Sequence, residues 1–179
     1  MEFKEINEEV LYTTGGIVVL EQNDMNFLKE KAARIQRRRI RFCTHKDTED
    51  SPQEMFIVHT KDTYVRPHKH LDKAESLYII EGRADLLFFD DKGRITDVYE
   101  LGDYHSGKRF YCRITESYYH SLLIYSDFII FHEVTKGPFV RANSIFAPWS
   151  PADGDSLAVS EFLIDIRARL HDFKETQLP

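Results

Sequence analysis

The sequence has little cysteine. Cys43 and Cys112 are the two cysteines among 179 residues, and neither belongs to a C-x-x-C pair. Because no secretion signal accompanies them, two isolated thiols are better explained as reduced core residues than as a disulfide. A fold held together by several disulfides is therefore excluded, and stability has to come from a packed core.

The chain also lacks an excess of positive charge. It carries 24 Lys and Arg residues against 30 Asp and Glu residues, which gives a formal net charge of -6. General binding to DNA or RNA depends on a basic surface that neutralises phosphates. We therefore expect no nucleic-acid partner.

Long apolar runs are missing as well. Residues 1–5 include two acidic side chains and no apolar run of signal length, and no later stretch reaches the roughly 18 apolar residues that span a bilayer. We expect no membrane partner and a cytoplasmic location.

What the sequence does contain is enough apolar material for one core. Hydrophobic residues make up 42% of the chain, aromatic residues 13% and charged residues 30%, a composition typical of a globular protein. The length is close to that of one domain. We expect a strand and a helix over residues 1–36, a β-barrel over 37–136, and a covering loop with a C-terminal helix over 137–179, all in one structural domain.

The middle of the chain has the pattern of an all-β domain, because short runs rich in Ile, Val, Phe, Tyr and Leu alternate with turn residues. Gly93 follows Asp90-Asp91-Lys92 in a hairpin, where it is free to take a positive φ, and Gly82 lies in a tighter turn. The expected strands are Met55–His59, Ser76–Glu81, Ala84–Phe89, Ile95–Leu101, Arg109–Ile114, Tyr119–Tyr125 and Phe128–Val134. So many closely spaced strands indicate a sandwich or a barrel.

Helical patterns flank this region. The first helix is expected over Met25–Gln36, after a short strand at Ile17–Leu20, and should pack outside the main body. A last, amphipathic helix follows Asp155 or Ser156 and packs on the barrel or on a second subunit. The expected apolar positions of this helix are Leu157, Phe162, Leu163, Ile166 and Leu170.

Four residues form a candidate metal site. His68 and His70 stand at i and i+2, so on an extended strand both imidazoles point to the same face. Glu75 follows at a distance that lets a short loop present its carboxylate from the neighbouring strand, and His120 begins a later β run. Three nitrogens and one oxygen suit one divalent ion, Fe, Mn, Zn, Ni or Co, with positions left for water or substrate. The alternative is that these are solvated or core side chains.

The spacing of these residues resembles the first motif of the cupin superfamily, which has Gly, five residues, His-x-His, three or four residues, Glu, six residues and Gly. His68, His70 and Glu75 match it, and Gly82 closes it. Asp62 stands in place of the leading Gly, which a turn tolerates.

A second cupin motif has Pro-x-Gly-x-x-His followed by Asn, and this chain retains His120 of it. The resemblance implies an all-β fold, a cupin β-barrel that is a jelly-roll-like double-stranded β-helix, with an N-terminal and a C-terminal flanking helix. Because cupins commonly pair through a barrel edge or a terminal segment, we also expect a homodimer. Ile17–Leu20 and the last helix offer apolar material for it.

A closer resemblance is to the WbuC-type cupin-fold metalloproteins. It is carried by Arg37-Arg38-Arg39 with Arg41 and His45, by Tyr64 to His70, by Phe88 to Gly93, by Glu133 to Pro138, and by Phe146 to Trp149. Members of that family often lie among bacterial surface-polysaccharide (O-antigen) genes. The resemblance implies the fold, a bound metal and a link to polysaccharide biosynthesis, and it leaves the reaction open.

Basic side chains form a candidate substrate-binding wall beside this site. Strand alternation beyond Arg38 places Arg39 and Arg41 on one side, and His45 follows on that side. If this side faces the barrel mouth, the guanidinium groups are bidentate donors for a phosphate or a carboxylate. The alternative is a solvated helix end, where cations complement the helix dipole.

Two further cations are candidate substrate contacts. Arg66 precedes the histidine pair by two residues and so shares its face in a regular strand, and Lys136 closes the mouth or is an ordinary surface lysine. His59 is better explained as a hydrogen-bonded core histidine than as a fifth ligand. His132 and Glu133 occupy opposite faces of one strand, so at most one of them points inward.

The sequence leaves three functions open. The first is a metal-dependent enzyme, an isomerase, epimerase or dioxygenase, that acts on a sugar, a nucleotide-sugar or another small anionic metabolite. The second is a module that binds or senses such a ligand without turnover, because a fold does not dictate a reaction. The third is a barrel in which the metal only stabilises the fold.

Overall fold

A computed structural model describes residues 1–176. The strands are β1 (Phe3–Asn7), β2 (Val10–Thr13), β3 (Arg39–Cys43), β4 (Pro52–Thr60), β5 (His68–His70), β6 (Glu75–Glu81), β7 (Arg83–Phe89), β8 (Ile95–Gly102), β9 (Tyr111–Ile114), β10 (Tyr119–Ile124), β11 (Phe128–Lys136) and β12 (Ser144–Phe146). The helices are α1 (Gln22–Arg34) and α2 (Ser156–Thr176), with 3-10 turns η1 (Tyr104–Ser106) and η2 (Arg141–Asn143).

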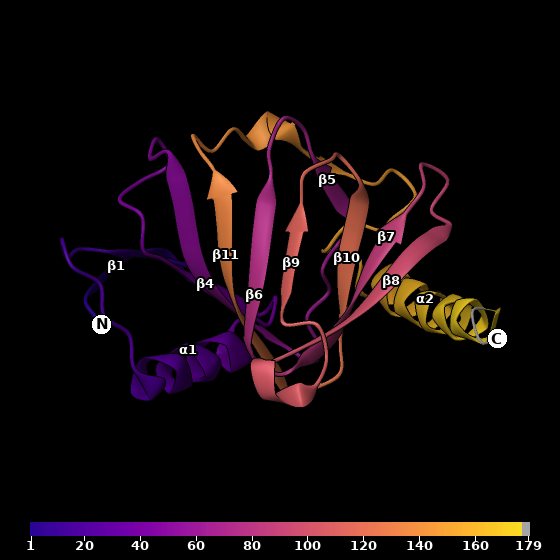
Figure 1. Ribbon diagram of the computed structural model, residues 1–179, viewed down its shortest axis with the longest axis horizontal. Coiled ribbons are helices and arrows are strands. Elements are labelled where there is room, and N and C mark those ends of the chain that lie inside the picture. Colours follow the sequence, from indigo (N-terminus) through magenta and orange to yellow (C-terminus); the bar gives the residue numbers. More distant parts are fainter. Residues whose placement is uncertain (177–179) are drawn as a thin grey trace.

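The strands form two facing sheets. One has seven strands in the order β1-β2-β3-β4-β11-β6-β9, and the other has five in the order β12-β5-β10-β7-β8. All neighbours are antiparallel except β2 and β3. From β5 onward the chain passes repeatedly from one sheet to the other, and the two sheets face each other around a common core (Figure 1). The predicted all-β fold with two flanking helices is confirmed.

The main core lies between the two sheets. It is made of alternate, inward-pointing residues of both, such as Ile57 and Phe131 from the first sheet and Leu86 and Leu122 from the second. Because side chains in a strand alternate between faces, this parity also decides which polar residues can reach the barrel interior. The alternation therefore determines which residues of a strand face the interior.

Helix α1 covers the outer face of the seven-stranded sheet. Leu28 and Ala32 are fully buried against residues of β3, β4 and β11. The helix begins three residues earlier than the sequence predicts, because Glu21 and Asp24 form a reciprocal capping box.

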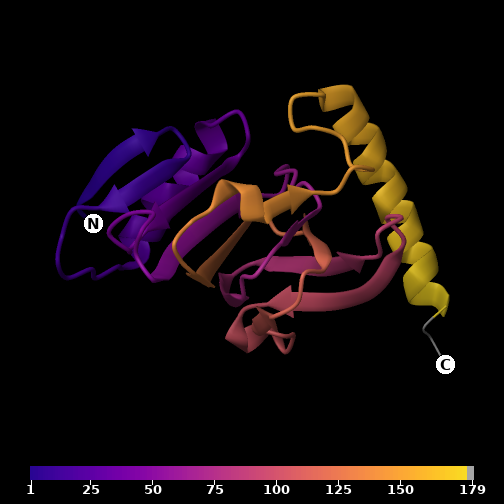
Figure 2. The same cartoon turned by 90° about the horizontal axis from the view of Figure 1, so that it is seen from above.

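At the opposite end of the molecule, helix α2 lies against the outside of the five-stranded sheet (Figure 2). Ile166 and Leu170 are its buried residues, and the predicted apolar position Leu157 is 70% exposed. Asp155 caps this helix by accepting a hydrogen bond from the backbone of Ala158, as expected.

Two local features differ from the sequence-based expectation. Residues 17–20 form no strand, and the N-terminal strands are instead β1 and β2, which extend the sheet beyond the barrel. The covering loop contains the short strand β12, which pairs with β5. None of the helices within residues 1–176 is long and apolar enough to cross a membrane.

A buried carboxylate connects α2 to the barrel. Asp85 on β7 has a side chain that is 3% exposed and accepts hydrogen bonds from Tyr125 Oη (2.7 Å) and Lys174 Nζ (2.8 Å). We expect Lys174→Met to lower the free energy of unfolding by about 1–3 kcal/mol, because it leaves a buried charged acceptor with one donor fewer.

The matched control for this prediction is Lys108→Met. Lys108 and Lys174 both pair with Glu100, but Lys174 alone of the two reaches Asp85. Urea unfolding of the two variants should separate the Asp85 contribution. Equal losses of stability would show that the surface pair with Glu100 accounts for the whole effect.

Candidate metal centre

Three histidines meet on the inner face of the five-stranded sheet. His68 on β5 is the cross-strand partner of His120 on β10, and His70 lies two residues along β5. The ring centroids of His68 and His120 are 4.5 Å apart, and one ring nitrogen from each of the three lies within 4.8 Å of the others. His68 and His70 therefore point to the same face of β5, as their spacing predicts.

Glu75 faces these rings from the other sheet. It begins β6, where it lies opposite Thr135 of β11, and its side chain is 6% exposed. Its Oε2 is 3.1 Å from His70 Nε2, and its Oε1 is 3.1 Å from His120 Nε2. The structure therefore brings all four sequence-predicted ligands together.

Hydrogen bonds fix the orientation of the imidazoles. His68 Nδ1 donates to the Arg66 carbonyl oxygen (2.8 Å), and His120 Nδ1 donates to the Tyr118 carbonyl oxygen (2.9 Å). His70 Nδ1 is 3.1 Å from Ser144 Oγ. Because a carbonyl only accepts, Nδ1 of His68 and of His120 carries a proton and Nε2 is the nitrogen left for a ligand, which is how outer-shell partners orient metal-bound histidines.

The electrostatics of the cluster keep the carboxylate charged. Burial alone would raise the pKa of Glu75, but the rings of His120 and His70 hold this pKa well below its usual range. Burial and the neighbouring His120 lower the pKa of His68 to about 3. For His120, burial is outweighed by the charge of Glu75, which raises its pKa above the ordinary value.

This donor set fits a divalent metal ion. The Nε2 atoms of His70 and His120 lie at hydrogen-bond distance from one carboxylate, so each of them either donates a proton to Glu75 or, when unprotonated, can ligate a cation beside it. Three imidazoles and one carboxylate are typical ligands of first-row divalent ions.

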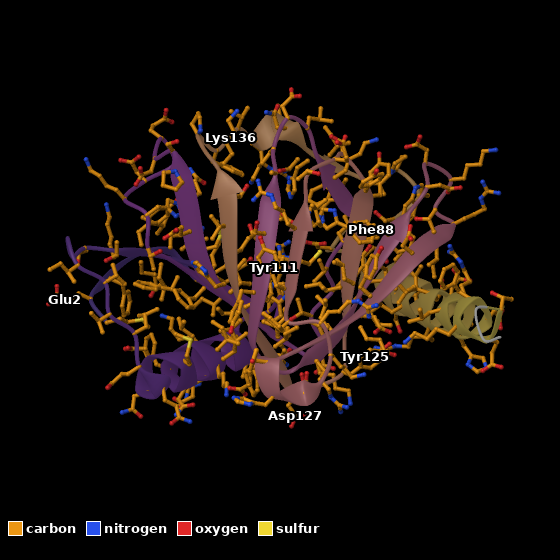
Figure 3. The ribbon with its side chains drawn as sticks, in the orientation of Figure 1. Glu2, Phe88, Tyr111, Tyr125, Asp127 and Lys136 are labelled. Carbon is orange, nitrogen blue, oxygen red and sulfur yellow. The ribbon has the colours of Figure 1, made fainter. Side chains whose placement is uncertain are left out.

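The cluster lies toward one end of the barrel. Glu75 is paired with Thr135, the neighbour of Lys136, and Figure 3 shows Lys136 and Asp127 at opposite ends of the molecule. Lys136 is the last residue of β11, and strand alternation places it on the outward face. Together with Lys73 and Asp72 it lines a small cavity of about 180 Å³ at this end.

Two of the other predicted substrate contacts, Arg39 and Arg66, are paired with residues of the chain itself. Arg39 pairs with Glu9 (3.0 Å) and Asp153 (3.7 Å). Arg66 donates to Ser150 and lies 4.7 Å from the Phe146 ring centroid.

His45 and Arg41 lie on the inward side of β3 or of its extension. His45 Nδ1 lies 2.9 Å from the Glu54 carbonyl oxygen and 3.1 Å from the Glu54 backbone nitrogen. Arg41 makes no side-chain hydrogen bond or ion pair with residues 1–176. The substrate-binding role of these residues stays a prediction.

Two strand histidines lie outside the cluster, and the alternation of side chains sends them to opposite faces of the seven-stranded sheet. His132 points outward, where its ring lies 4.9 Å from that of Phe56, so Glu133 is the inward-pointing member of the pair. His59 is buried against Phe131, with a centroid distance of 5.5 Å, and its Nδ1 has no partner among the residues described.

Sequence reasoning missed Glu133 as a candidate functional residue. It lies on the same inward face as Glu75, one row away across the β6–β11 pair. Burial, and then the charge of Glu75, raise the pKa of Glu133 to about 7, while Lys73 and Arg41 act in the opposite direction. The alternation Ile129, Phe131, Glu133 was the available signal, because its first two members are core residues.

Comparisons with known proteins give one partial match to a family model. Residues 20–101 match a domain of unknown function (DUF6016). A search of curated proteins finds no match.

Among solved structures the chain is similar to the DMSP lyase DddQ from Ruegeria pomeroyi (14% identity, TM-score 0.49, 64% of this chain and 54% of that one). It is also similar to protein SO0799 from Shewanella oneidensis (10% identity, TM-score 0.46, 57% and 66%) and to the capsular polysaccharide assembling protein CapF from Staphylococcus aureus (15% identity, TM-score 0.45, 55% and 27%). The matched segment is less than two thirds of each of these proteins.

Proposed function

We propose that this protein is a metal-dependent cupin that binds one divalent ion through His68, His70, Glu75 and His120. We further propose that it acts on a small anionic, sugar-like metabolite. The observation that carries the proposal is the convergence of ring nitrogens from three histidines, two of which lie 3.1 Å from the Glu75 carboxylate. The resemblance of the sequence to WbuC-type proteins supports a role in bacterial surface-polysaccharide biosynthesis.

The chain prepares this site for catalysis in two ways. Hydrogen bonds from Nδ1 of His68 and His120 to backbone carbonyls hold the rings without help from a metal, so little reorganisation is needed when the ion binds. Burial of Glu75 and His120 excludes water from one side of the centre. A bound divalent ion would act as a Lewis acid toward a carbonyl or hydroxyl oxygen of the ligand.

Metal-loaded protein incubated with a panel of sugar phosphates, nucleotide-sugars and sugar acids tests this function. Conversion is measured by mass spectrometry, and ligand binding by the shift in melting temperature. We expect a product that is absent with the His68→Ala/Glu75→Ala variant. Stabilisation by a ligand without any product would instead support a binding module, and the absence of both responses would contradict the proposal.

A further inference from the structure

The inward side of β3 carries polar side chains that the metal centre does not use. Arg39, Arg41 and Cys43 share one face of this strand, and Cys43 belongs to the core between the sheets. Arg41 lies between Val10 of β2 and Ile57 of β4, both of which belong to the same core. The side chain of Arg41 therefore leaves β3 on the interior side of the sheet.

Arg41 differs from its arginine neighbours in having no anionic partner. Arg37 and Arg39 both pair with Glu9 and Asp153, and these contacts fasten the covering loop to β3. Within residues 1–176, the Arg41 side chain makes no ion pair or hydrogen bond, and it is exposed. Its five donors are available to a ligand.

The charge of Arg41 acts on the groups that surround it. Burial raises the pKa of the Cys43 thiol to about 11, and Arg41 opposes this rise. Burial lowers the pKa of His59 to about 3, with Arg41 adding to the effect. Arg41 also lowers the pKa of Glu133, against the larger effects of burial and Glu75. These three groups belong to the inward faces of β3, β4 and β11.

A second observation marks the same face. His45 and His59 are 6% and 8% exposed, and His45 Nε2 and His59 Nδ1 are buried without a partner in the described chain. His45 Nδ1 lies 2.9 Å from the Glu54 carbonyl oxygen and 3.1 Å from the Glu54 backbone nitrogen. In either tautomer its Nε2 is buried without a partner among the described residues. Unpaired buried polar groups are uncommon and are usually satisfied by a ligand or water.

We propose that Arg41, with His59 one row away on the same face, forms an oxyanion-binding subsite for a carboxylate or phosphate group. Arg41 supplies the charge and a fork of donors that matches such a group. This inference rests on the proposed function, because the subsite would hold the charged end of the ligand whose other end lies at the metal centre.

The register connects the two sites. Arg41, Ile57 and Phe131 form one cross-strand row, and the next row contains Cys43, Met55 and Glu133. Glu133 in turn lies one row from Glu75 on the neighbouring strand pair. Glu133 therefore lies on the inward face between the row of Arg41 and the row of Glu75.

Isothermal titration of the purified full-length protein with inorganic phosphate and with succinate tests the subsite and distinguishes the two anion types. We expect at least one of them to bind the wild type. Arg41→Ala should weaken that binding about 10- to 100-fold, and Arg41→Lys by less, because lysine keeps the charge but loses the fork. The matched control is Arg34→Ala, whose side chain on α1 is 82% exposed.

Metal content measured on the same samples separates this inference from the proposed function. An Arg41→Ala variant that keeps its metal and loses the anion supports the subsite. If neither anion binds the wild type, or if Arg41→Ala binds as tightly as Arg34→Ala, the subsite is wrong while the metal centre can still be right. If the wild type holds no metal but binds an anion through Arg41, the subsite stands and the metal-dependent function fails.

Discussion

The His120→Ala variant is expected to bind divalent metal at least about 100-fold more weakly than the wild type. Loss of an outer-shell partner alone typically costs 10- to 100-fold in metal affinity, and this substitution removes a ligand. It also leaves Glu75 without one of its two imidazole neighbours. Competition with a chromophoric chelator, using zinc as the probe, measures the change.

His132→Ala is the control for this experiment. His132 is also a strand histidine, but it points to the outer face and packs on Phe56. Its affinity for zinc should equal that of the wild type. If both variants bind zinc as the wild type does, His120 is not a ligand; if both lose affinity equally, the loss reflects a general effect on the fold.

The Gly82→Ala variant is expected to lose more than about 3 kcal/mol of unfolding free energy, or roughly 10 °C in melting temperature. Gly82 has a φ of +92°, and a Cβ placed there would lie 2.2 Å from the carbonyl oxygen of Phe128. Neither the turn nor β11 can move without disturbing the pairing of β6 with β11. Calorimetry of the apo protein measures the loss.

Gly107→Ala separates the two causes of that loss. Gly107 also has a positive φ, +72°, but a Cβ there would meet no atom within 4 Å. This variant should lose only about 1–2 kcal/mol, the conformational cost of the left-handed region. Equal losses at the two positions would mean that the close approach to Phe128 has no energetic effect.

The part of the site that follows from local periodicity could be predicted from the sequence. His68 and His70 share a face because strand side chains alternate, and Glu75 follows after a short loop. His120 could be placed only by its position in a later strand, and its contact with His68 depends on the register of β10 with β5. That register is a property of the whole sheet, so the sequence indicates it less directly.

The partners of the arginines could not be predicted. Alternation places Arg39 and Arg41 on one face, but the distinction between them depends on Glu9 and Asp153, which lie far from them in sequence. Long-range ion pairs of this kind depend on how the termini fold back over the barrel. The same holds for β12, a strand within a loop whose sequence is dominated by turn residues.

The metal content of the untagged protein, purified from metal-replete medium and measured by inductively coupled plasma mass spectrometry, tests the central claim most directly. We expect about one divalent ion per chain in the wild type and almost none in the His68→Ala/Glu75→Ala variant, provided that circular dichroism shows both to be folded. A wild type without metal, or a folded double variant with the same metal content, would contradict the assignment of this cluster as the metal centre.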